Sequence, residues 1–257
     1  MDAPVRLPDL PAPYDRLDWR PLTAQRNARK SGVLLAEHEG RTVVAKHAPA
    51  AAHWTPVGLY RRFALKHEVE ALRALAGIPG VPALLAAGPT GFVLAHAPGA
   101  PLAEWPRGRV PARVFDELDR IVDAIHGRGF VVGDLHRRNI LVDEAAVGRR
   151  DADGTETPPP AGADPGRGVH VIDYELALDR RRLLGRLLGG RIARVDGLSL
   201  ARTRQKYGVP LEARHVQTLE AGWPWPYNWG RAFKVWLHDR KGHEPRARPE
   251  STPRTPS

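Results

Sequence analysis

Five polar side chains in the sequence lie inside or directly beside apolar runs. Lys46 ends the run TVVAK, and Glu68 falls within a pattern of apolar residues with helical spacing. Asp134 and Asn139 bracket a short loop between the apolar runs VV and ILV, and Asp173 follows two β-branched residues in VIDYE. Burying a carboxylate is unfavourable unless a cation or hydrogen bonds meet it. These positions are therefore candidates for chemistry rather than for packing.

Each of these residues also has an ordinary structural interpretation. A lysine at a strand end is usually a surface residue, and a glutamate on a helix usually faces solvent. The stretch VVGDLHRRNILVDE at 131–144 also reads as two strands joined by a turn. In chain order, however, the residues give a strand lysine, a helix glutamate, an aspartate with an asparagine five positions later, and an aspartate after a strand. Enzymes of phosphoryl transfer use that order, so we interpret residues 131–144 as a catalytic loop.

The first part of the chain must supply the strand and the helix of this scheme. Residues 34–37 and 42–46 flank a polar turn with one glycine, which predicts a β-hairpin. Helical spacing of apolar residues predicts a helix over 60–76, ended by a glycine. Residues 81–87 and 92–95 flank a Gly-Pro-Thr-Gly turn and predict two further strands. The apolar residues of the predicted helix are Phe63, Leu65, Val69, Leu72 and Leu75.

The second part of the chain is predicted to be mostly helical and to follow a Pro-Gly-Ala-Pro break at 98–101. Apolar spacing predicts a helix over 112–126, ended by glycines. Residues 148–168 hold almost no apolar side chain and are expected to form a flexible surface insertion. A strand is expected over 170–178 and helices over 179–221. Two apolar stripes are predicted there: Leu183, Leu184, Leu187 and Leu188, then Leu198, Leu200, Tyr207 and Leu211.

Strands with one helix, followed by helices with a short β element, indicate an α+β protein of two lobes joined near residues 96–102. Residues 1–21 are Pro-rich and are expected to be extended. Residues 22–96 are expected to form the first lobe and residues 97–239 the second. Residues 240–257 are polar and are expected to form a disordered tail.

The composition excludes several classes of protein. The chain of 257 residues has no cysteine, so disulfides and thiolate metal sites are excluded and the reducing cytoplasm is the expected compartment. Neither a membrane span, which needs an apolar run of about 18 residues, nor a secretory signal is expected. The histidines form no HExxH motif, so a zinc site is not expected.

The net charge of +10 and the isoelectric point near 10.4 are typical of nucleic-acid-binding proteins. We nevertheless expect no specific nucleic-acid partner. The basic residues are mostly arginines, spread through a chain that is also rich in Ala, Gly and Pro. They become denser after Arg180, so a basic face toward an anionic partner remains an alternative for that part.

Five segments resemble the protein-kinase-like superfamily, and the resemblance covers residues 30–180 in outline. The most specific segment is HGRGFVVGDLHRRNILVD (126–143), which is similar to the catalytic loops of that superfamily. The others gain weight mainly from it. VVAK, ending at Lys46, resembles the strand-lysine motif, and HEVEAL (67–72) resembles the helix that carries its ion-pair partner. GFVLAHAPGAPL (91–102) resembles the hinge, and VIDYELA (171–177) resembles the metal-binding aspartate motif.

The resemblance implies a bilobal α+β fold, with a small antiparallel β-sheet and one helix in the N-lobe and a mostly helical, shortened C-lobe. It implies that Lys46 binds the α- and β-phosphates of ATP and that Glu68 holds Lys46 in place. Asp134 is then the catalytic residue that accepts the proton of the acceptor hydroxyl. Asn139 and Asp173 are the implied ligands of Mg²⁺, or of Mn²⁺ in its place.

Three features depart from ordinary Ser/Thr kinases. The region of the Gly-rich phosphate loop, RNARKSGVLLA, offers only Gly32. Val132 and Gly133 stand where His-Arg precedes the catalytic aspartate, so control by activation-loop phosphorylation is not expected. Tyr174 and Glu175 replace Phe-Gly, and no Ala-Pro-Glu motif follows. The chain is therefore more similar to compact atypical bacterial kinases, RIO-like or lipopolysaccharide-core Kdo kinases, and to the aminoglycoside and choline phosphotransferases.

The expected activity is transfer of the γ-phosphate of ATP to a hydroxyl, either of a protein Ser/Thr or of a sugar or lipid-linked sugar. The alternative is a pseudokinase, a nucleotide-binding regulatory protein without transfer activity, which the poor phosphate loop favours. The segment WPWPYNWGRAFKVWLH (223–238) packs against the C-lobe in the simpler interpretation. In the alternative interpretation, this segment inserts shallowly at the inner membrane surface, which suits a lipid-linked acceptor.

Overall fold

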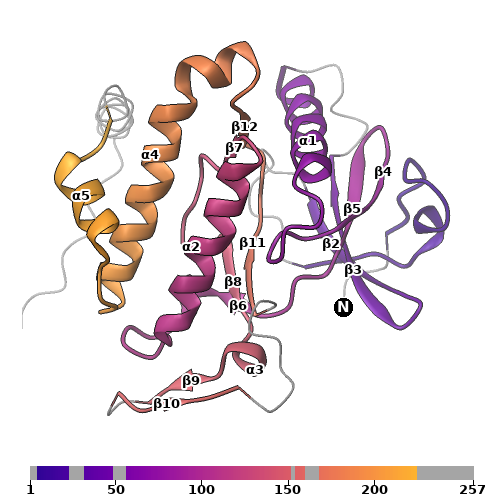
Figure 1. Cartoon of the computed structure of the whole chain (residues 1–257). Coiled ribbons are helices and arrows are strands. Elements are labelled where there is room, and N and C mark those ends of the chain that lie inside the picture. Colours follow the sequence, from indigo (N-terminus) through magenta and orange to yellow (C-terminus); the bar gives the residue numbers. More distant parts are fainter. Residues whose placement is uncertain (1–4, 23–31, 49–55, 152–153, 160–167, 225–257) are drawn as a thin grey trace, which may run out of the picture. The chain divides into compact units, whose positions relative to one another are not determined.

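The described chain is of the α+β class, as the sequence predicts, with five α-helices and strands that pair only in the antiparallel sense (Figure 1). The computed structural model describes residues 5–22, 32–48, 56–151, 154–159 and 168–224. Three regions that the sequence analysis uses therefore lie outside it: most of the phosphate-loop region, most of the Trp-rich segment 223–238, and the tail 240–257.

The predicted hairpin is confirmed and is longer than expected. Strands β2 (Gly32–His38) and β3 (Arg41–His47) pair along their whole length. Glu39 and Gly40 join them with φ values of 51° and 71°. Two successive left-handed residues make the two-residue turn whose twist matches that of the flanking strands.

The hairpin belongs to a five-stranded sheet with the order β1-β2-β3-β5-β4. The outer members are β1 (Arg20–Pro21) and β4 (Leu84–Ala87), and β5 (Gly91–Ala95) lies between β3 and β4. Both strands predicted around the Gly-Pro-Thr-Gly turn are present, although β4 is shorter than expected. Because side chains alternate along a strand, Val43 and Ala45 face one side of the sheet and Lys46 faces the other.

Helix α1 (Pro56–Ala74) packs on the side of the sheet that Lys46 faces, where its Leu65, Val69 and Leu72 join Phe92 of β5 in the main core. The helix is confirmed, but its predicted apolar stripe is wrong at Phe63, whose side chain is 69% exposed. At about 100° per residue, Phe63 points away from the face that Leu65 and Leu72 share.

The first residues are not simply extended, because they pack over the other face of the sheet. Leu7, Leu10 and Trp19 are buried in a second apolar cluster with residues of β2, β3 and β5. Val5 bridges to Trp19, whose Nε1 donates to the carbonyl of Tyr14 at 3.0 Å. The short 3₁₀ helix η1 (Tyr14–Arg16) turns the chain between them. The Pro-rich composition gave no indication that Leu7, Leu10 and Trp19 are buried.

The rest of the described chain is mainly helical. Helix α2 (Ala112–Gly127) buries the apolar face that the sequence predicts, and α4 (Leu183–Lys206) and α5 (Ala213–Ala221) follow it (Figure 1). Buried ion pairs join these helices, since Arg204 of α4 reaches Asp119 of α2 at 2.5 Å. The shorter elements are β6 (Ala100–Pro101), η3 (Leu102–Glu104), β7 (Phe130–Val131), β8 (Ile140–Val142), α3 (Glu144–Val147), β9 (Arg149–Arg150), β10 (Glu156–Thr157), β11 (Val169–Val171) and β12 (Leu178–Asp179).

Three expectations for the second part differ from the structure. Within 148–168, β9 and β10 pair as a ribbon that contacts α2, because Glu156 accepts from the amide of Ala112. The single strand expected over 170–178 is two short strands, since the left-handed Asp173 (φ 68°) turns the chain between them. In the first predicted stripe of α4, Leu183 and Leu187 are exposed rather than buried.

The described residues up to Gly222 belong to one compact unit. The junction of two lobes near residues 96–102 stays a prediction. Among the described residues, none of the helices has both the length and the apolar character that crossing a bilayer requires.

Replacing Trp19 with alanine tests the packing of the first residues. The side chain is fully buried, and loss of a buried Trp typically costs about 3–5 kcal/mol. We expect Trp19→Ala to lower the free energy of unfolding, measured by urea denaturation, by about that amount. The matched control is Leu22→Ala, at a side chain that is 52% exposed, with an expected change within about 0.5 kcal/mol. Equal effects of the two substitutions would contradict this account of the segment.

Candidate active site

Lys46 lies between two carboxylates from distant parts of the sequence. Its Nζ donates to Glu68 Oε2 at 2.6 Å and to Asp173 Oδ1 at 2.9 Å. The three residues come from β3, from α1 and from the turn after β11. Three of the residues that the sequence analysis selects are thus in direct contact.

The environment of Lys46 keeps it charged. Burial on its own would lower the pKa of the ammonium group, but the carboxylates of Glu68 and Asp173 outweigh that effect and hold the pKa above its ordinary value. Glu68 is buried and is bonded through both oxygens, because its Oε1 accepts from the amide of Tyr174 at 3.2 Å. The Asp173 side chain is 38% exposed, so it remains open to a further ligand.

A tight turn positions Asp173. The residue has left-handed backbone torsion angles, with φ at 68°, a conformation that non-glycine residues adopt rarely, although aspartate adopts it more readily than most. Neighbouring contacts fix the turn on both sides. The amide of Ile172 donates to the carbonyl of Asn139 at 2.8 Å, and the buried Tyr174 hydroxyl donates to the carbonyl of Val171 at 3.0 Å. The strain is therefore held by hydrogen bonds that surround it.

The loop from Gly133 to Asn139 is closed by its own asparagine. The side-chain Nδ2 of Asn139 donates to the carbonyl of Asp134 at 3.1 Å, and the backbone amide of Asn139 donates to the carbonyl of His136 at 2.8 Å. The Asp134 side chain is 46% exposed, with His136 Nε2 3.8 Å from its Oδ2. The structure thus brings Asn139 next to the turn that carries Asp173, and leaves the carboxylate of Asp134 accessible.

Asp196, which the sequence did not indicate as a site residue, supports the start of this loop. The residue lies in α4, is fully buried, and accepts from the amides of Val132 at 2.8 Å and Gly133 at 3.0 Å. Its Oδ2 also lies 3.1 Å from His126 Nε2 of α2. Hydrogen bonds to a charged acceptor are the strong ones, so Asp196 ties the start of the loop to two helices. No local pattern marks Asp196 in the sequence, because Thr203 and Arg204 of the same helix are also polar and buried.

The backbone at Gly133 requires a glycine. It adopts φ of 78°, and a Cβ at this position would lie 2.6 Å from the carbonyl oxygen of Leu176. A side chain in the backbone conformation seen here would therefore clash with the segment that follows Asp173. The glycine lets the two segments approach closely.

Apolar side chains share the side of the sheet on which Lys46 lies. Val33 pairs opposite Lys46, Val44 precedes it by two residues on the same strand, and Leu94 pairs opposite Val44. All three are partly exposed, whereas the opposite face is covered by the first residues of the chain. This face could not be predicted from the sequence, because a strand pattern does not say which face of the sheet remains uncovered.

A second pair of partly exposed apolar residues belongs to the small sheet that carries Asp173. Leu141 of β8 and Ile172 after β11 are half-buried, while their neighbours Ile140, Val142 and Val171 are fully in the main core. Alternation therefore directs Leu141 away from that core. Ile172 directly precedes Asp173, whose carboxylate reaches Lys46.

Gly32 is the first residue of β2, where it is buried and pairs with His47. The residues before it, 23–31, lie outside the described chain. A role for Gly32 in contacting phosphates therefore stays a prediction.

The donor groups of Asn139 and Asp173 suit a divalent cation. Mg²⁺ binds through hard oxygen ligands and retains several waters, and these residues offer an amide oxygen and a carboxylate. Because Asn139 Nδ2 donates to the carbonyl of Asp134, its amide oxygen is directed away from that carbonyl. The partial exposure of Asp173 leaves room for water around an ion.

A second group of potential metal ligands, Asp119, Glu212 and His215, does not fit a metal as well. Asp119 already contacts Arg204 at 2.5 Å and Arg214 at 3.2 Å. His215 Nδ1 accepts from the amide of Glu212, which leaves Nε2 to donate to Asp119. We therefore interpret these residues as an ion-pair network that joins α2, α4 and α5.

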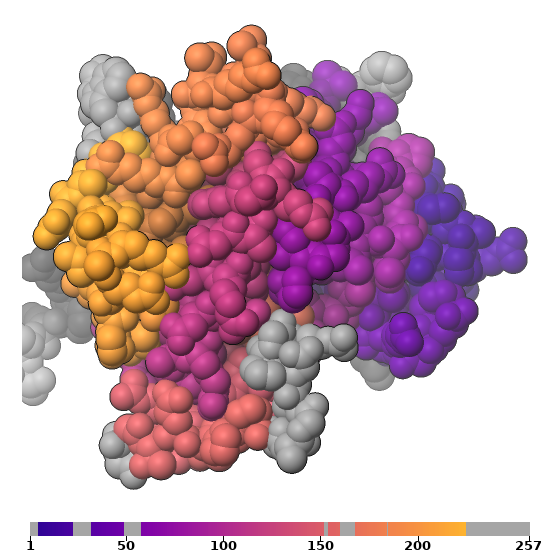
Figure 2. All heavy atoms as spheres, viewed as in Figure 1, coloured from indigo at the N-terminus to yellow at the C-terminus, as the bar shows by residue number. Residues whose placement is uncertain are grey.

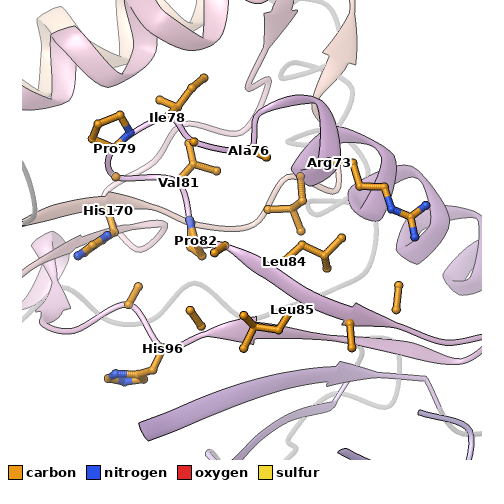
Figure 3. A pocket seen from close by; sticks show the side chains of 18 residues that line it. Arg73, Ala76, Ile78, Pro79, Val81, Pro82, Leu84, Leu85, His96 and His170 are labelled. Atoms are coloured by element: carbon orange, nitrogen blue, oxygen red, sulfur yellow. The ribbon is translucent and has the colours of Figure 1, made fainter. Parts of the chain in front are cut away.

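A pocket of about 1090 Å³ lies away from Lys46, between the end of α1, the loop that follows, β4 and the segment after β5. Figure 3 shows its lining as mostly apolar, with Ile78, Val81 and Leu84 on one side and His96 and His170 on the other. None of the candidate catalytic residues lines it, so size alone does not identify the site.

Comparison with known proteins names no family for this arrangement. No protein-family model matches the chain, and no curated protein matches it significantly.

Replacing Gly133 with alanine tests the close approach at the loop. Gly40 provides a matched control, because it also has a positive φ, of 71°, but no atom lies within 4 Å of its added Cβ. Both substitutions meet the same unfavourable backbone conformation, and only Gly133→Ala meets the Leu176 carbonyl. We expect Gly133→Ala to destabilise the protein by about 1–3 kcal/mol more than Gly40→Ala in urea denaturation. Equal losses would show that the two segments do not approach closely.

Proposed function

We propose that this chain is an ATP-dependent kinase with a bilobal protein-kinase-like fold, which transfers the γ-phosphate of ATP to a hydroxyl. The observation that carries the proposal is the contact of Lys46 with Glu68 and Asp173, at 2.6 and 2.9 Å. A strand lysine, a helix glutamate and a turn aspartate meet there, although they are up to 127 residues apart in the sequence. Phosphoryl transfer needs such fixed charges more than it needs covalent chemistry.

In this proposal the five-stranded sheet with α1 is the N-lobe, and α2, α4 and α5 with the short strands are the C-lobe. Lys46 binds the α- and β-phosphates, and Glu68 fixes the direction of its side chain. The apolar side chains on the same side of the sheet, Val44 and Leu94, cover one face of the nucleotide base. Leu141 and Ile172 cover the other face, which accounts for four apolar side chains that the core leaves partly exposed.

Asn139 and Asp173 would hold Mg²⁺, or Mn²⁺, and the ion would supply charge neutralisation at the phosphates. The carboxylate of Asp173 stands directly after a buried strand and is partly exposed, so it can bind both Lys46 and an ion.

Asp134 is the proposed catalytic residue for the acceptor. Its accessible carboxylate orients the acceptor hydroxyl and takes up its proton as the new O–P bond forms. The bond between the γ-phosphorus and the bridging oxygen breaks, and ADP leaves with the electron pair of that bond. Asn139 and Asp196 hold the backbone of the loop, so the position of the Asp134 backbone is set before substrate binds.

The acceptor belongs to one of two classes, a protein Ser/Thr or a sugar or lipid-linked sugar. Only nine residues separate Asp173 from the start of α4 at Leu183, which leaves no long activation segment. Gly133 also replaces the arginine that pairs with a phosphorylated activation loop. Both features favour a kinase that is not switched by phosphorylation of such a loop.

A pseudokinase is the second candidate. Two observations favour it: Asp173 Oδ1 already binds Lys46, and the phosphate-loop region has only Gly32. Such a protein would bind nucleotide without transferring phosphate.

A transfer assay with ATP labelled at the γ-phosphate tests the proposal and separates the two candidates. The acceptor source is a lysate that lacks this protein, and the label is sorted into protein, lipid and small-molecule fractions. We expect wild type with Mg²⁺ to label one of these fractions. Asp134→Asn should lower the rate by at least about 100-fold while Mg-ATP binding, measured separately, stays nearly unchanged.

The matched control is Asp143→Asn, at a nearby aspartate whose side chain caps α3 by accepting from Ala145. Asparagine caps a helix as well as aspartate does, so this variant should transfer phosphate like wild type. Binding of Mg-ATP without any transfer by wild type would support the pseudokinase. The absence of both binding and transfer would refute nucleotide-dependent function of either kind.

A further inference from the structure

Six of the ten exposed large hydrophobic side chains in the described residues come from two short segments. One segment is the first half of α1, and the other runs from the turn after Asp173 into the start of α4. The most exposed are Leu183, at 77%, and Phe63, at 69%. Soluble proteins rarely gather such side chains without a partner. The six are Leu59, Tyr60, Phe63, Leu176, Leu183 and Leu187.

The two segments are neighbours in space. The Tyr60 hydroxyl donates to Glu175 Oε1 at 3.1 Å, and Arg182 Nη2 lies 2.9 Å from Glu70 Oε2. Phe63 also lines a pocket of about 570 Å³ together with Arg182 and Gly185. Figures 1 and 2 show the start of α4, in orange, beside α1, in purple, at the top of the view. The exposed side chains of both segments therefore belong to one surface, which we call the α1–α4 surface.

Cations surround the apolar side chains of the α1–α4 surface. Residues 178–191 contain five arginines and one acid, and residues 59–66 contain three basic residues and no acid. Seven of these basic residues are exposed. The acids of this surface are engaged, since Asp179 pairs with Arg181, Glu70 pairs with Arg182, and Glu175 accepts from Tyr60. The exposed basic residues are Arg62, Lys66, Arg180, Arg181, Arg182, Arg186 and Arg191.

The same cations are unfavourably placed with respect to helix α4. Helix N-termini carry a partial positive charge that favours acidic residues. At α4, Arg180, Arg181 and Arg182 precede the helix, its first turn has no acid, and its N-cap makes no side-chain hydrogen bond. An anionic partner at this surface would offset both the clustered cations and the helix dipole.

We infer that the α1–α4 surface docks onto an anionic lipid bilayer. Aromatic and leucine side chains enter the boundary between headgroups and acyl chains, and arginines beside them bind lipid phosphates while their stems stay in the apolar layer. The described surface offers both kinds of side chain, interleaved on two adjacent segments. The inference does not depend on the proposed kinase activity, because none of these residues belongs to the Lys46 site.

Co-sedimentation with lipid vesicles tests the inference on the full chain. The vesicles contain phosphatidylcholine and phosphatidylglycerol in equal parts, and vesicles of phosphatidylcholine alone serve as the neutral reference. We expect wild type to bind the anionic vesicles at least about tenfold more tightly than the neutral ones, with binding that weakens as salt is raised. The apolar variant Phe63→Ala/Leu183→Ala/Leu187→Ala and the charge variant Arg62→Gln/Arg186→Gln should each lose at least about tenfold in affinity.

The matched control is Leu22→Ala/Leu85→Ala/Val216→Ala, which removes three exposed apolar side chains elsewhere on the described residues. It should bind anionic vesicles like wild type, and unchanged circular dichroism would show that all variants fold. Failure of wild type to bind anionic vesicles would overturn the inference, as would equal binding by wild type and the apolar variant. Self-association of wild type that the apolar variant abolishes, without vesicle binding, would assign the surface to a second copy of the chain instead.

A further variant, Trp229→Ala/Trp236→Ala, separates this surface from the Trp-rich segment. Retention of vesicle binding by this variant, with loss in the apolar variant, would support the α1–α4 surface. The opposite pattern would overturn it.

Discussion

The interaction on which the rest of the site depends is the contact of Lys46 with two carboxylates. Glu68 is buried, and a buried carboxylate without a partner is costly. Lys46 supplies that partner and at the same time holds Asp173 through its other hydrogen bond. Removing one member of such a group typically costs about 3–5 kcal/mol, because it leaves an uncompensated charge. The ammonium group of Lys46 therefore links the sheet, helix α1 and the turn at Asp173, in addition to the apolar packing of α1 on the sheet.

The loop beside this group is organised through its backbone. Asp196 accepts from the backbone amides of Val132 and Gly133. The side chain of Asn139 closes the loop, and the carbonyl of Asn139 accepts from the backbone amide of Ile172. The side chain of Asp134 takes part in none of these contacts and stays accessible to solvent. Rigid backbone and an accessible acid are the combination that positioning a substrate hydroxyl requires.

Residue spacing was sufficient to predict the elements that local patterns define. The β2–β3 hairpin and α2 follow their apolar periodicity closely, and the motif order predicted that Lys46, Glu68 and Asp173 act together. Spacing could not show which apolar face remains uncovered, so Phe63, Leu183 and Leu187 were expected in stripes that pack. It could not show that Asp173 turns a strand by adopting a left-handed conformation. Trp19 and Asp196 act through contacts distant in sequence, which leave almost no local pattern.

The most direct test of the central claim is calorimetric titration of ATP into the protein with and without Mg²⁺. The account predicts that wild type binds ATP in a Mg²⁺-dependent manner. It also predicts that Asp173→Asn, which keeps the shape of the side chain but removes its charge, weakens Mg-ATP binding about 10–100-fold. Wild type that binds no Mg-ATP, or an Asp173→Asn variant that binds it as tightly as wild type, would contradict the account.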